Sequence, residues 1–370
     1  MIFSTSKTEL QKALQKLSKA TPTRSTLPIL SCVLISTKKD KTNLKATDLE
    51  ITIEVNIPSS VEEEGTKALP LKTLLEITNE LPETRLTIKV DKQNKVKIKT
   101  DLGEYDLMAK PAEEYPEQKE GDLINKIKIP GPILKKIIDS SVFAVSRDEL
   151  KPALTGVFFK ISPEGITAVS TDGHRLVKYK NTNYKTGGEE IETIIPKKFL
   201  TYLSTQTKDK DVSLFFEKKQ TRARLEEDLI TTRTIGETFP NYKTVIPTES
   251  NKELKINKND LLGAIRRVSI FSNKATHQVA LSLQKDNCKI TTEDPEKSSK
   301  AQESIVGEYE GDSVVIGYNA EYLKDIVSHV YGENVLIQLN TSVSAALFSP
   351  IKHEKNTETT MLLMPIRLND

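Results

Sequence analysis

A short apolar strand followed by an amphipathic helix occurs three times in this chain of 370 residues. In the first copy, Ile2-Phe3 predicts the strand, and Ser4 or Ser6 offers an N-cap oxygen for the helix. Glu9, three residues after Ser6, has the spacing of a capping box. The helix that follows has an apolar stripe on one side and lysines on the other: Leu10, Ala13, Leu14 and Leu17 against Lys12, Lys16 and Lys19. The next copies contain Ile129 and Ile256, at intervals of about 126 residues. The chain must therefore repeat one folding unit three times.

Other landmarks keep nearly the same interval. A second helix is predicted after Pro70, Pro196 and Asn319, each with a leucine four residues further on. A strand ends in a turn at Asp48, Asp172 and Asp294. Each third closes with a similar pair of residues: Tyr115-Pro116, Phe239-Pro240 and Met364-Pro365. We therefore predict three homologous domains, with boundaries at 1–122, 123–249 and 250–370.

Between the helices lie runs rich in Ile, Val and Thr, separated by short polar breaks. In the first third these runs are 29–36, 44–47, 50–57, 85–90, 95–100 and 104–110. Their spacing is typical of antiparallel strands. The predicted fold class is α+β, with two helices on antiparallel sheets in each domain.

Charge and hydropathy argue against two classes of protein, those that span a membrane and those that are secreted. Net charge is only +2, and no apolar run approaches the length of a membrane span, nor does the N-terminus have the plan of a signal peptide. We therefore expect a cytoplasmic protein. Cys32 and Cys288 each stand alone in a strand-like context, so we expect reduced packing residues and no disulfide or metal site.

Sequence motifs of the common enzyme classes are absent. The chain contains no glycine-rich phosphate loop, no Gly-x-Ser-x-Gly elbow, no His-Glu-x-x-His and no Cys-x-x-Cys. His174 is the histidine that a catalytic hypothesis would choose, but Asp172-Gly173 before it is typical of a hairpin turn. We predict a protein without catalytic residues or cofactors.

The size of the repeat limits what it can enclose. A domain of this length behaves as a sphere about 35 Å across. Three such spheres in contact leave a gap of about 5 Å, whereas six leave about 35 Å, wider than a DNA duplex of about 20 Å. Two copies of the chain, joined head to tail, supply six domains.

Cationic helix faces turned toward such an opening would surround phosphates without reading bases, so binding would be weak, salt-sensitive and indifferent to sequence. For one helix alone, Lys12, Lys16 and Lys19 are better explained as a solvated face, but the threefold recurrence favours the functional interpretation. The second helices are a weaker case, because their basic residues alternate with acidic ones such as Glu76 and Glu321.

Several motifs resemble the bacterial sliding clamps, the beta subunit of DNA polymerase III. They occur in order over the whole chain: Leu27-Pro28-Ile29-Leu30, Ala46-Thr47-Asp48-Leu49-Glu50, Ser170-Thr171-Asp172-Gly173-His174-Arg175-Leu176, Phe239-Pro240-x-Tyr242 and Met364-Pro365-Ile366-Arg367-Leu368. The resemblance implies a homodimeric ring that slides on duplex DNA and tethers the replicative polymerase. It also implies a pocket between domains two and three that binds short linear peptides of the polymerase, the clamp loader and repair proteins.

Motif positions then assign the site residues. The implied pocket consists of Leu154, Thr171, Gly173, His174, Arg175, Leu176, Pro240, Val245, Asn319, Tyr322, Val343, Leu362, Met364, Pro365, Ile366, Arg367 and Leu368. Its apolar members would form an adaptable trough, and Arg175 with the turn amides would orient a peptide. The implied DNA-facing residues are Arg24, Lys72, Lys151, Lys197 and Lys198. The implied dimer contacts join Tyr105 and Leu107 on an edge strand to Ile270 and Phe271 of a second copy.

This chain departs from the family pattern at a few positions. Pro152-Ala153 replaces an aromatic pair, Thr244 stands where an arginine can line the pocket, and His277 occupies a place often held by arginine. Asn369-Asp370 extend past the usual end, near the mouth of the implied pocket.

Two other functions are compatible with the residues. One is a monomeric three-domain scaffold for proteins, whose basic helices are incidental. The other is a nucleic-acid enzyme that depends on His174. Sedimentation at a single-chain mass would favour the first, and metal-dependent turnover of DNA the second.

Overall fold

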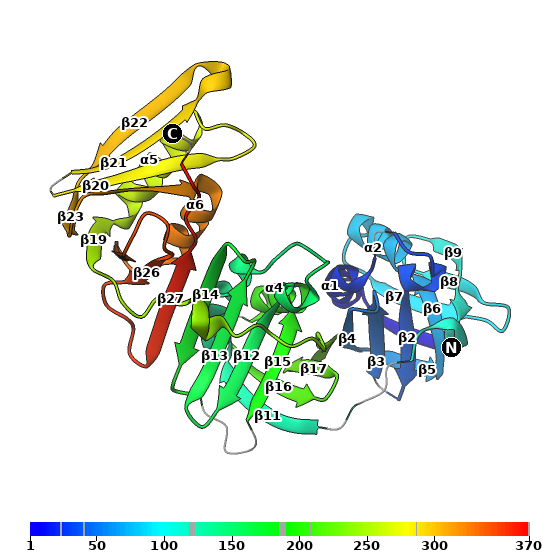
Figure 1. Cartoon of the computed structure of the whole chain (residues 1–370). Coiled ribbons are helices and arrows are strands. Elements are labelled where there is room, and N and C mark those ends of the chain that lie inside the picture. Colours follow the sequence, from blue (N-terminus) through cyan, green and yellow to red (C-terminus); the bar gives the residue numbers. More distant parts are fainter. Residues whose placement is uncertain are drawn as a thin grey trace. The chain divides into compact units, whose positions relative to one another are not determined.

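The computed structural model describes residues 1–22, 24–39, 41–117, 121, 123–184, 190–207, 209–285 and 287–368. Figure 1 draws the whole chain with its helices and strands labelled. By its contacts the chain divides into two compact units. The first consists of Met1–Lys135 with Lys198–Thr234, and the second of Lys136–Lys197 with Ile235–Asp370. This division cuts the middle third in two, so the three boundaries derived from the repeat stay a prediction. The Asn369-Asp370 extension lies outside the described residues.

The first unit contains two antiparallel sheets. The five-stranded sheet has the order β5 (Ser60–Glu63), β1 (Ile2–Ser6), β7 (Arg85–Val90), β8 (Lys95–Lys99) and β9 (Glu104–Met108). The nine-stranded sheet has the order β10 (Lys110–Pro111), β6 (Gly65–Pro70), β2 (Cys32–Lys38), β3 (Lys41–Thr47), β4 (Ile51–Pro58), β18 (Asp228–Arg233), β17 (Gln220–Leu225), β16 (Asp211–Glu217) and β11 (Leu123–Pro130). This second sheet thus joins strands of the first and middle thirds.

The second unit also contains two antiparallel sheets. Its nine-stranded sheet has the order β15 (Ile191–Pro196), β12 (Gly156–Ser162), β13 (Gly165–Thr171), β14 (Arg175–Asn181), β27 (Thr357–Leu363), β26 (Ala346–Pro350), β25 (Asn334–Leu339), β19 (Lys252–Asn257) and β23 (Gly307–Glu310). Its four-stranded sheet has the order β22 (Ser299–Ile305), β21 (Asn287–Asp294), β20 (Gln278–Gln284) and β24 (Val314–Asn319). The large sheet joins strands of the middle and last thirds.

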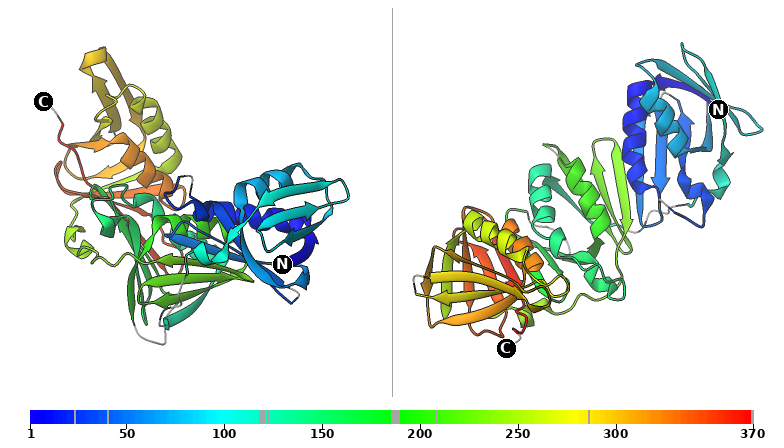
Figure 2. Two further views of the ribbon diagram at one scale, coloured as in Figure 1. Left: turned by 90° about the vertical axis from the view of Figure 1, so that its right-hand side faces the viewer. Right: turned by 90° about the horizontal axis from the view of Figure 1, so that it is seen from above.

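Each third contributes two α-helices. They are α1 (Lys7–Leu17), α2 (Leu71–Glu80), α3 (Gly131–Asp139), α4 (Lys197–Gln206), α5 (Lys258–Ser269) and α6 (Ala320–His329). The short 3₁₀ helices are η1 (Ser18–Ala20), η2 (Pro28–Ser31), η3 (Ala112–Glu114), η4 (Val142–Ala144), η5 (Pro152–Leu154), η6 (Tyr242–Val245) and η7 (Pro295–Lys297). Helices α1 and α2 pack together in the first unit, as do α5 and α6 in the second (Figure 2). The predicted α+β class, with two helices per repeat, is confirmed.

Helix starts follow the predicted capping residues. The Ser6 hydroxyl accepts a hydrogen bond from the Glu9 amide at 3.2 Å, as the capping-box spacing predicts. The Asn319 side chain caps α6 in the same way. Two predictions are wrong in detail. The strand expected from residue 29 begins only at Cys32, because Pro28 starts a 3₁₀ turn, and Lys19 lies in η1 beyond the end of α1.

Both large sheets cross from one third of the chain to the next through a regular ladder. In the first unit, β4 pairs with β18 from Ile51↔Thr232 to Glu54↔Leu229. In the second unit, β14 pairs with β27 over seven residues, from Arg175↔Leu363 to Asn181↔Thr357. Backbone hydrogen bonds therefore join successive thirds of the chain.

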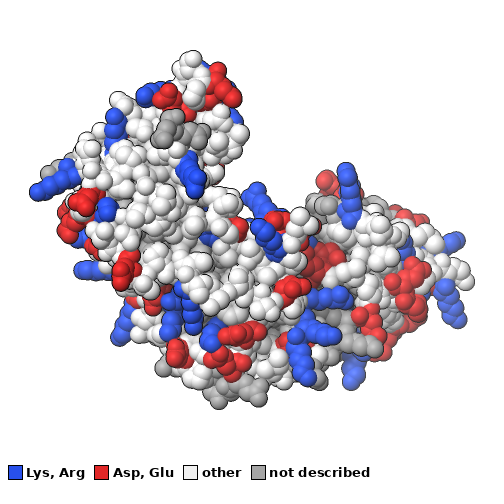
Figure 3. Space-filling model, viewed as in Figure 1, with Lys and Arg blue, Asp and Glu red and all other residues white. Residues whose placement is uncertain are grey.

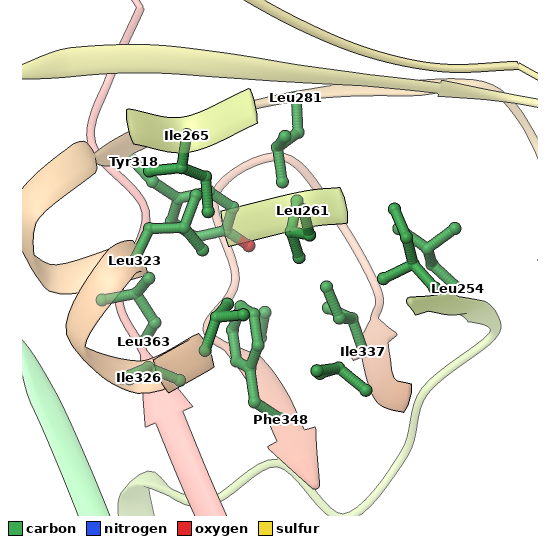
Figure 4. Close-up of a cluster of buried hydrophobic side chains, with 14 of the residues drawn as sticks. Leu254, Leu261, Ile265, Leu281, Tyr318, Leu323, Ile326, Ile337, Phe348 and Leu363 are labelled. Carbon is green, nitrogen blue, oxygen red and sulfur yellow. The ribbon is translucent and has the colours of Figure 1, made fainter. Parts of the chain in front are cut away.

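Apolar side chains of α5 and α6 converge on the strands of the last third (Figure 4). Leu261 and Leu323 are fully buried there, beside Phe348 and Tyr318. The Tyr318 ring meets the Phe348 ring edge-on at 6.4 Å, and burial raises the pKa of its hydroxyl. Among the described residues this hydroxyl has no hydrogen-bond partner. Cys288 lies in the same core, and burial raises the pKa of its thiol to about 11, consistent with the predicted packing role.

We expect Tyr318→Phe to leave the thermal unfolding midpoint unchanged or raised, because it removes a buried hydroxyl that no described group satisfies. Tyr309→Phe is the matched control. Its hydroxyl donates to the Asp312 carbonyl at 2.5 Å, so its loss should cost about 1 kcal/mol. Differential scanning calorimetry compares the two variants. An equal loss of stability in both would contradict the assignment.

Candidate functional site

The turn between β13 and β14 is built by its own side chains. The Asp172 carboxylate accepts hydrogen bonds from the amides of His174 and Arg175, both at 3.0 Å. The Thr171 hydroxyl donates to the Arg175 carbonyl at 2.6 Å and accepts from the Gly173 amide at 3.1 Å. Gly173 has φ +92°, where a side chain would be strained. The turn therefore has a fixed shape, with His174 exposed and Arg175 buried.

Arg175 is the most connected residue of this region. Its guanidinium donates to Asp172 at 3.0 Å, to Asp325 of α6 at 2.7 Å and to the Phe143 carbonyl at 3.0 Å. Its Cζ lies 5.5 Å from the Phe143 ring and 4.8 Å from the Tyr322 ring. Only 8% of the residue is exposed. Arg175 therefore links the middle third to α6, and its side chain is already engaged within the fold.

The last residues of the chain turn back across the second unit. After β27, the Met364 amide donates to the His174 carbonyl at 2.8 Å, and the Ile366 amide donates to the Gly317 carbonyl at 2.9 Å. A Cβ on Gly317 would lie 2.7 Å from the Ile366 carbonyl oxygen and equally close to Leu368. Glycine is thus required where the tail crosses β24. His174 is stacked on Tyr322 with ring centroids 5.7 Å apart.

An apolar cluster, which we name the apolar patch, lies beside this turn. Its buried base consists of Val169, Leu176 and Leu362. Its partly buried members are Phe158, Phe239, Tyr242, Ile246, Ala345 and Leu347. The Phe158 and Phe239 rings stack at 5.1 Å, and Tyr242 meets both at an angle. These side chains come from β12, β13, β14, β26, β27 and the segment around η6, so one surface combines the middle and last thirds.

The structure brings most of the predicted pocket residues together. Leu176 and Leu362 belong to the patch, and Pro240 and Val245 directly adjoin its members Phe239 and Ile246 in the chain. Hydrogen bonds and ring contacts connect the residues around the turn, which are Thr171, Gly173, His174, Arg175, Asn319, Tyr322 and Met364. The tail consists of Pro365, Ile366, Arg367 and Leu368. Val343 lies 71% exposed in a turn two residues before Ala345. Leu154 ends η5, and its carbonyl accepts a hydrogen bond from the Ser146 amide at 2.9 Å.

Sequence reasoning missed several members of this region. Phe158, Val169 and Leu347 lie on strands, where alternation predicts burial but not which sheet face continues into a patch. Phe239 and Tyr242 belong to a motif from which only Pro240 was assigned. Asp325 lies on α6, outside the motifs that assign pocket residues. Its bond to Arg175 spans 150 positions, and no local pattern indicates it.

The predicted DNA-facing residues are distributed over both units. Arg24, Lys72 and Lys198 belong to the first, and Lys151 and Lys197 to the second. The Lys72 side chain is 87% exposed, and its ammonium lies 3.8 Å from Glu76. Burial lowers the pKa of Lys197, and the nearby charges of Arg147 and Arg175 lower it further. Basic and acidic residues alternate over the surface that Figure 3 shows.

The predicted dimer residues lie at accessible positions. Tyr105 and Leu107 lie on β9, which pairs with β8 alone among the described strands. Ile270 and Phe271 follow α5 directly and are 67% and 45% exposed. Adjacent exposed apolar side chains of this size are typical of interfaces.

Two negative findings concern the described part of the chain. No three His, Cys, Asp or Glu residues in it are grouped so that they could hold a metal ion. None of its helices combines the length and the apolar composition that crossing a bilayer requires.

Family models match all three thirds of the chain. Residues 1–119 match the N-terminal domain of the DNA polymerase III beta subunit, residues 128–241 its central domain and residues 243–367 its C-terminal domain. The matches follow one another in the order of the repeat.

Full-length relatives agree. The beta sliding clamp of Pseudomonas putida is 30% identical over 372 residues, with all of both chains covered, and that of Synechococcus elongatus is 28% identical over 368 residues, with 97% of each covered. A sliding clamp structure from Bacillus subtilis has a TM-score of 0.94 at 27% identity, and one from Pseudomonas aeruginosa bound to griselimycin has 0.92 at 27%. Both cover 100% of each chain. The chain therefore belongs to the DNA polymerase III beta subunit family, the beta sliding clamps of bacterial DNA replication.

Proposed function

We propose that two copies of this chain form a closed ring around duplex DNA and hold the replicative polymerase on its template. The observation that carries the proposal is the match of three successive family domains over the whole length of the chain. The ring would act by encirclement and without catalysis, as a processivity factor in the cytoplasm. Its domains would be residues 1–122, 123–249 and 250–370.

Two free sheet edges support head-to-tail closure. β9 ends the five-stranded sheet of the first third, and β22 ends the four-stranded sheet of the last third. Each exposes backbone groups that a strand of another chain can pair with. Ile270 and Phe271 add exposed apolar surface in the last third, and Tyr105 and Leu107 are half-buried on β9. Pairing of the first third with the last third of a second copy would close six domains into one ring.

The interior of the ring would hold duplex DNA without reading its sequence. The implied DNA-facing residues Arg24, Lys72, Lys151, Lys197 and Lys198 would supply positive charge to the phosphates, which are the same at every base pair. Lysine ammonium groups act on phosphates as point charges and allow rapid exchange between neighbouring phosphates. Binding of this kind permits sliding.

The apolar patch and the adjoining tail would form the docking site for partner peptides. Phe158, Phe239 and Tyr242 provide half-buried aromatic surface, and Met364, 42% exposed, provides an adaptable side chain at the rim. The implied pocket would include Leu176 and Leu362 of this surface. We propose that the polymerase, the clamp loader and repair proteins insert short linear peptides here, and that griselimycin, which the Pseudomonas aeruginosa relative binds, occupies the same patch.

A topological test separates encirclement from adhesion. After a clamp loader has placed the protein on a nicked circular duplex, we expect it to remain bound through gel filtration. Cutting the circle with a restriction enzyme should release it, because a ring slides off free ends. Equal retention on circular and linear DNA would contradict the proposal.

Phe271→Asp should convert the dimer to a single-chain mass in sedimentation, because a charge would be placed in an apolar interface. Ile351→Asp is the matched control, since Ile351 is 44% exposed and Phe271 45%. Dimer mass that persists in the Phe271 variant, or that is lost equally in both, would argue against the assigned contact.

Met364→Ala should weaken griselimycin binding about tenfold, because it removes an exposed apolar side chain at the rim of the proposed contact. Leu49→Ala, a change of similar exposure in the first unit, should bind like the parent protein. Isothermal titration calorimetry measures both.

Removal of residues 364–370 should abolish binding of griselimycin and leave the sedimenting mass unchanged. Loss of the dimer on this truncation would show that the segment is structural instead. If Met364→Ala and the truncated protein both bound griselimycin as tightly as the parent, the binding site would lie elsewhere.

A further inference from the structure

Two ion pairs flank the ladder between β4 and β18. At one end, Lys16 of α1 lies 2.5 Å from Asp228, the first residue of β18. At the other end, Lys198 of α4 is bonded to Asp48 in the turn before β4. Each pair joins the first third to the middle third. Lys16 of the first third binds Asp228 of the middle third, whereas Lys198 of the middle third binds Asp48 of the first. Lys16 lies on the basic face of α1, and Lys198 is one of the DNA-facing residues that the family resemblance implies.

The Asp48 carboxylate is held in place by the backbone. Its Oδ1 accepts hydrogen bonds from the amides of Glu50 at 3.0 Å and Ile51 at 2.9 Å, and its Oδ2 receives Lys198. The Asp48 side chain is 8% exposed, whereas that of Lys198 is 42% exposed. The Asp48 carboxylate is thus fixed in place and binds the ammonium group of Lys198, which is still partly exposed to solvent. A DNA phosphate would bind the same ammonium group in the same way.

The ladder does not depend on these ion pairs. Besides the strand pairing, the Thr232 hydroxyl donates to the Glu50 carbonyl at 3.0 Å, and the Asn56 amide group donates to the Glu227 carbonyl at 3.2 Å. Partly exposed ion pairs contribute little to stability. Their main effect is to neutralise Lys16 and Lys198.

Other basic residues near the proposed DNA path are paired less closely. The ammonium of Lys12 lies 3.7 Å from Glu9, that of Lys72 3.8 Å from Glu76, and that of Lys151 4.0 Å from Asp148. These pairs join residues three or four positions apart, and both partners are exposed. Asp48 and Asp228 differ because they reach their lysines from another third of the chain.

We propose that Asp48 and Asp228 compete with DNA phosphates for the ammonium groups of Lys198 and Lys16. Carboxylate and phosphodiester are both singly charged oxygen anions, so a lysine that binds a phosphate must first leave its aspartate. Each such contact with DNA then gains little free energy, and the ring slides with low resistance. This inference rests on the proposed function, which assigns Lys198 to the DNA-facing surface, and on the basic face of α1, which carries Lys16.

Asp48→Asn tests the inference with little change in shape. The asparagine oxygen can still accept from Glu50 and Ile51, so the turn is kept while the negative charge is removed. Asp211→Asn is the control of equal charge. The Asp211 carboxylate lies 2.7 Å from the Lys128 ammonium group. Helix α1 covers one face of this sheet, and Lys128 lies on the other face.

Binding of the full-length protein to a fluorescein-labelled linear duplex is measured by anisotropy over a range of salt concentrations. We expect Asp48→Asn to bind more tightly than the parent at low salt, with the slope of log K against log salt steeper by about 0.9. Between about 50 and about 200 mM salt, this steeper slope corresponds to an additional loss of about threefold in affinity. Asp211→Asn should leave the slope unchanged.

A double variant identifies the lysine. In Asp48→Asn combined with Lys198→Gln, the gain in affinity and slope should disappear. A gain that persists without Lys198, or that Asp211→Asn reproduces, would overturn the inference. The proposed function is tested separately, by retention on circular DNA. If the parent protein is retained there but Asp48→Asn does not bind DNA more tightly, the protein is a clamp in which these carboxylates do not compete with phosphates.

Discussion

The hydrogen-bonded ladders between successive thirds are the interaction on which the rest of this structure depends. Through β4 and β18 in one unit, and β14 and β27 in the other, strands of neighbouring repeats share one sheet. Backbone pairing is directional and fixes register, so side chains from different thirds take defined positions beside one another. The apolar patch exists because β13 and β14 continue into β27 and β26.

Charged side chains add further contacts between the thirds that the ladders join. Arg175 donates to a carboxylate of its own turn, to Asp325 of α6 and to the Phe143 carbonyl, and it lies between the Phe143 and Tyr322 rings. The sequence assigned Arg175 to a peptide, whereas the structure engages its guanidinium within the fold. Its influence on a peptide would act through the shape of the turn. Lys198 and Lys16 are likewise paired with carboxylates from another third.

Local sequence patterns predict part of the fold and part of the candidate site. The threefold repeat, the caps at Ser6 and Asn319 and the alternating strands follow from spacings of a few residues, and the fold class with two helices per third follows from them. The start of β2 was missed because Pro28 favours a 3₁₀ turn over an extended strand. Motif positions assign Thr171, Gly173, His174 and Arg175 to the pocket, and in the structure these residues share one hydrogen-bonded turn. Phe158, Leu347 and Asp325 escaped because their importance depends on neighbours far away in sequence, which a single sequence does not reveal.

The β14–β27 ladder has a consequence for the integrity of the chain. The connection at 247–251 carries none of the seven residue pairs that hold the last third to the middle one. A protease that cut there would yield two fragments that stay associated, held by the ladder and by the Arg175 bond to Asp325. Covalent continuity and structural continuity follow different paths in this molecule, so separately expressed pieces divided at this point have the surfaces needed to reassemble.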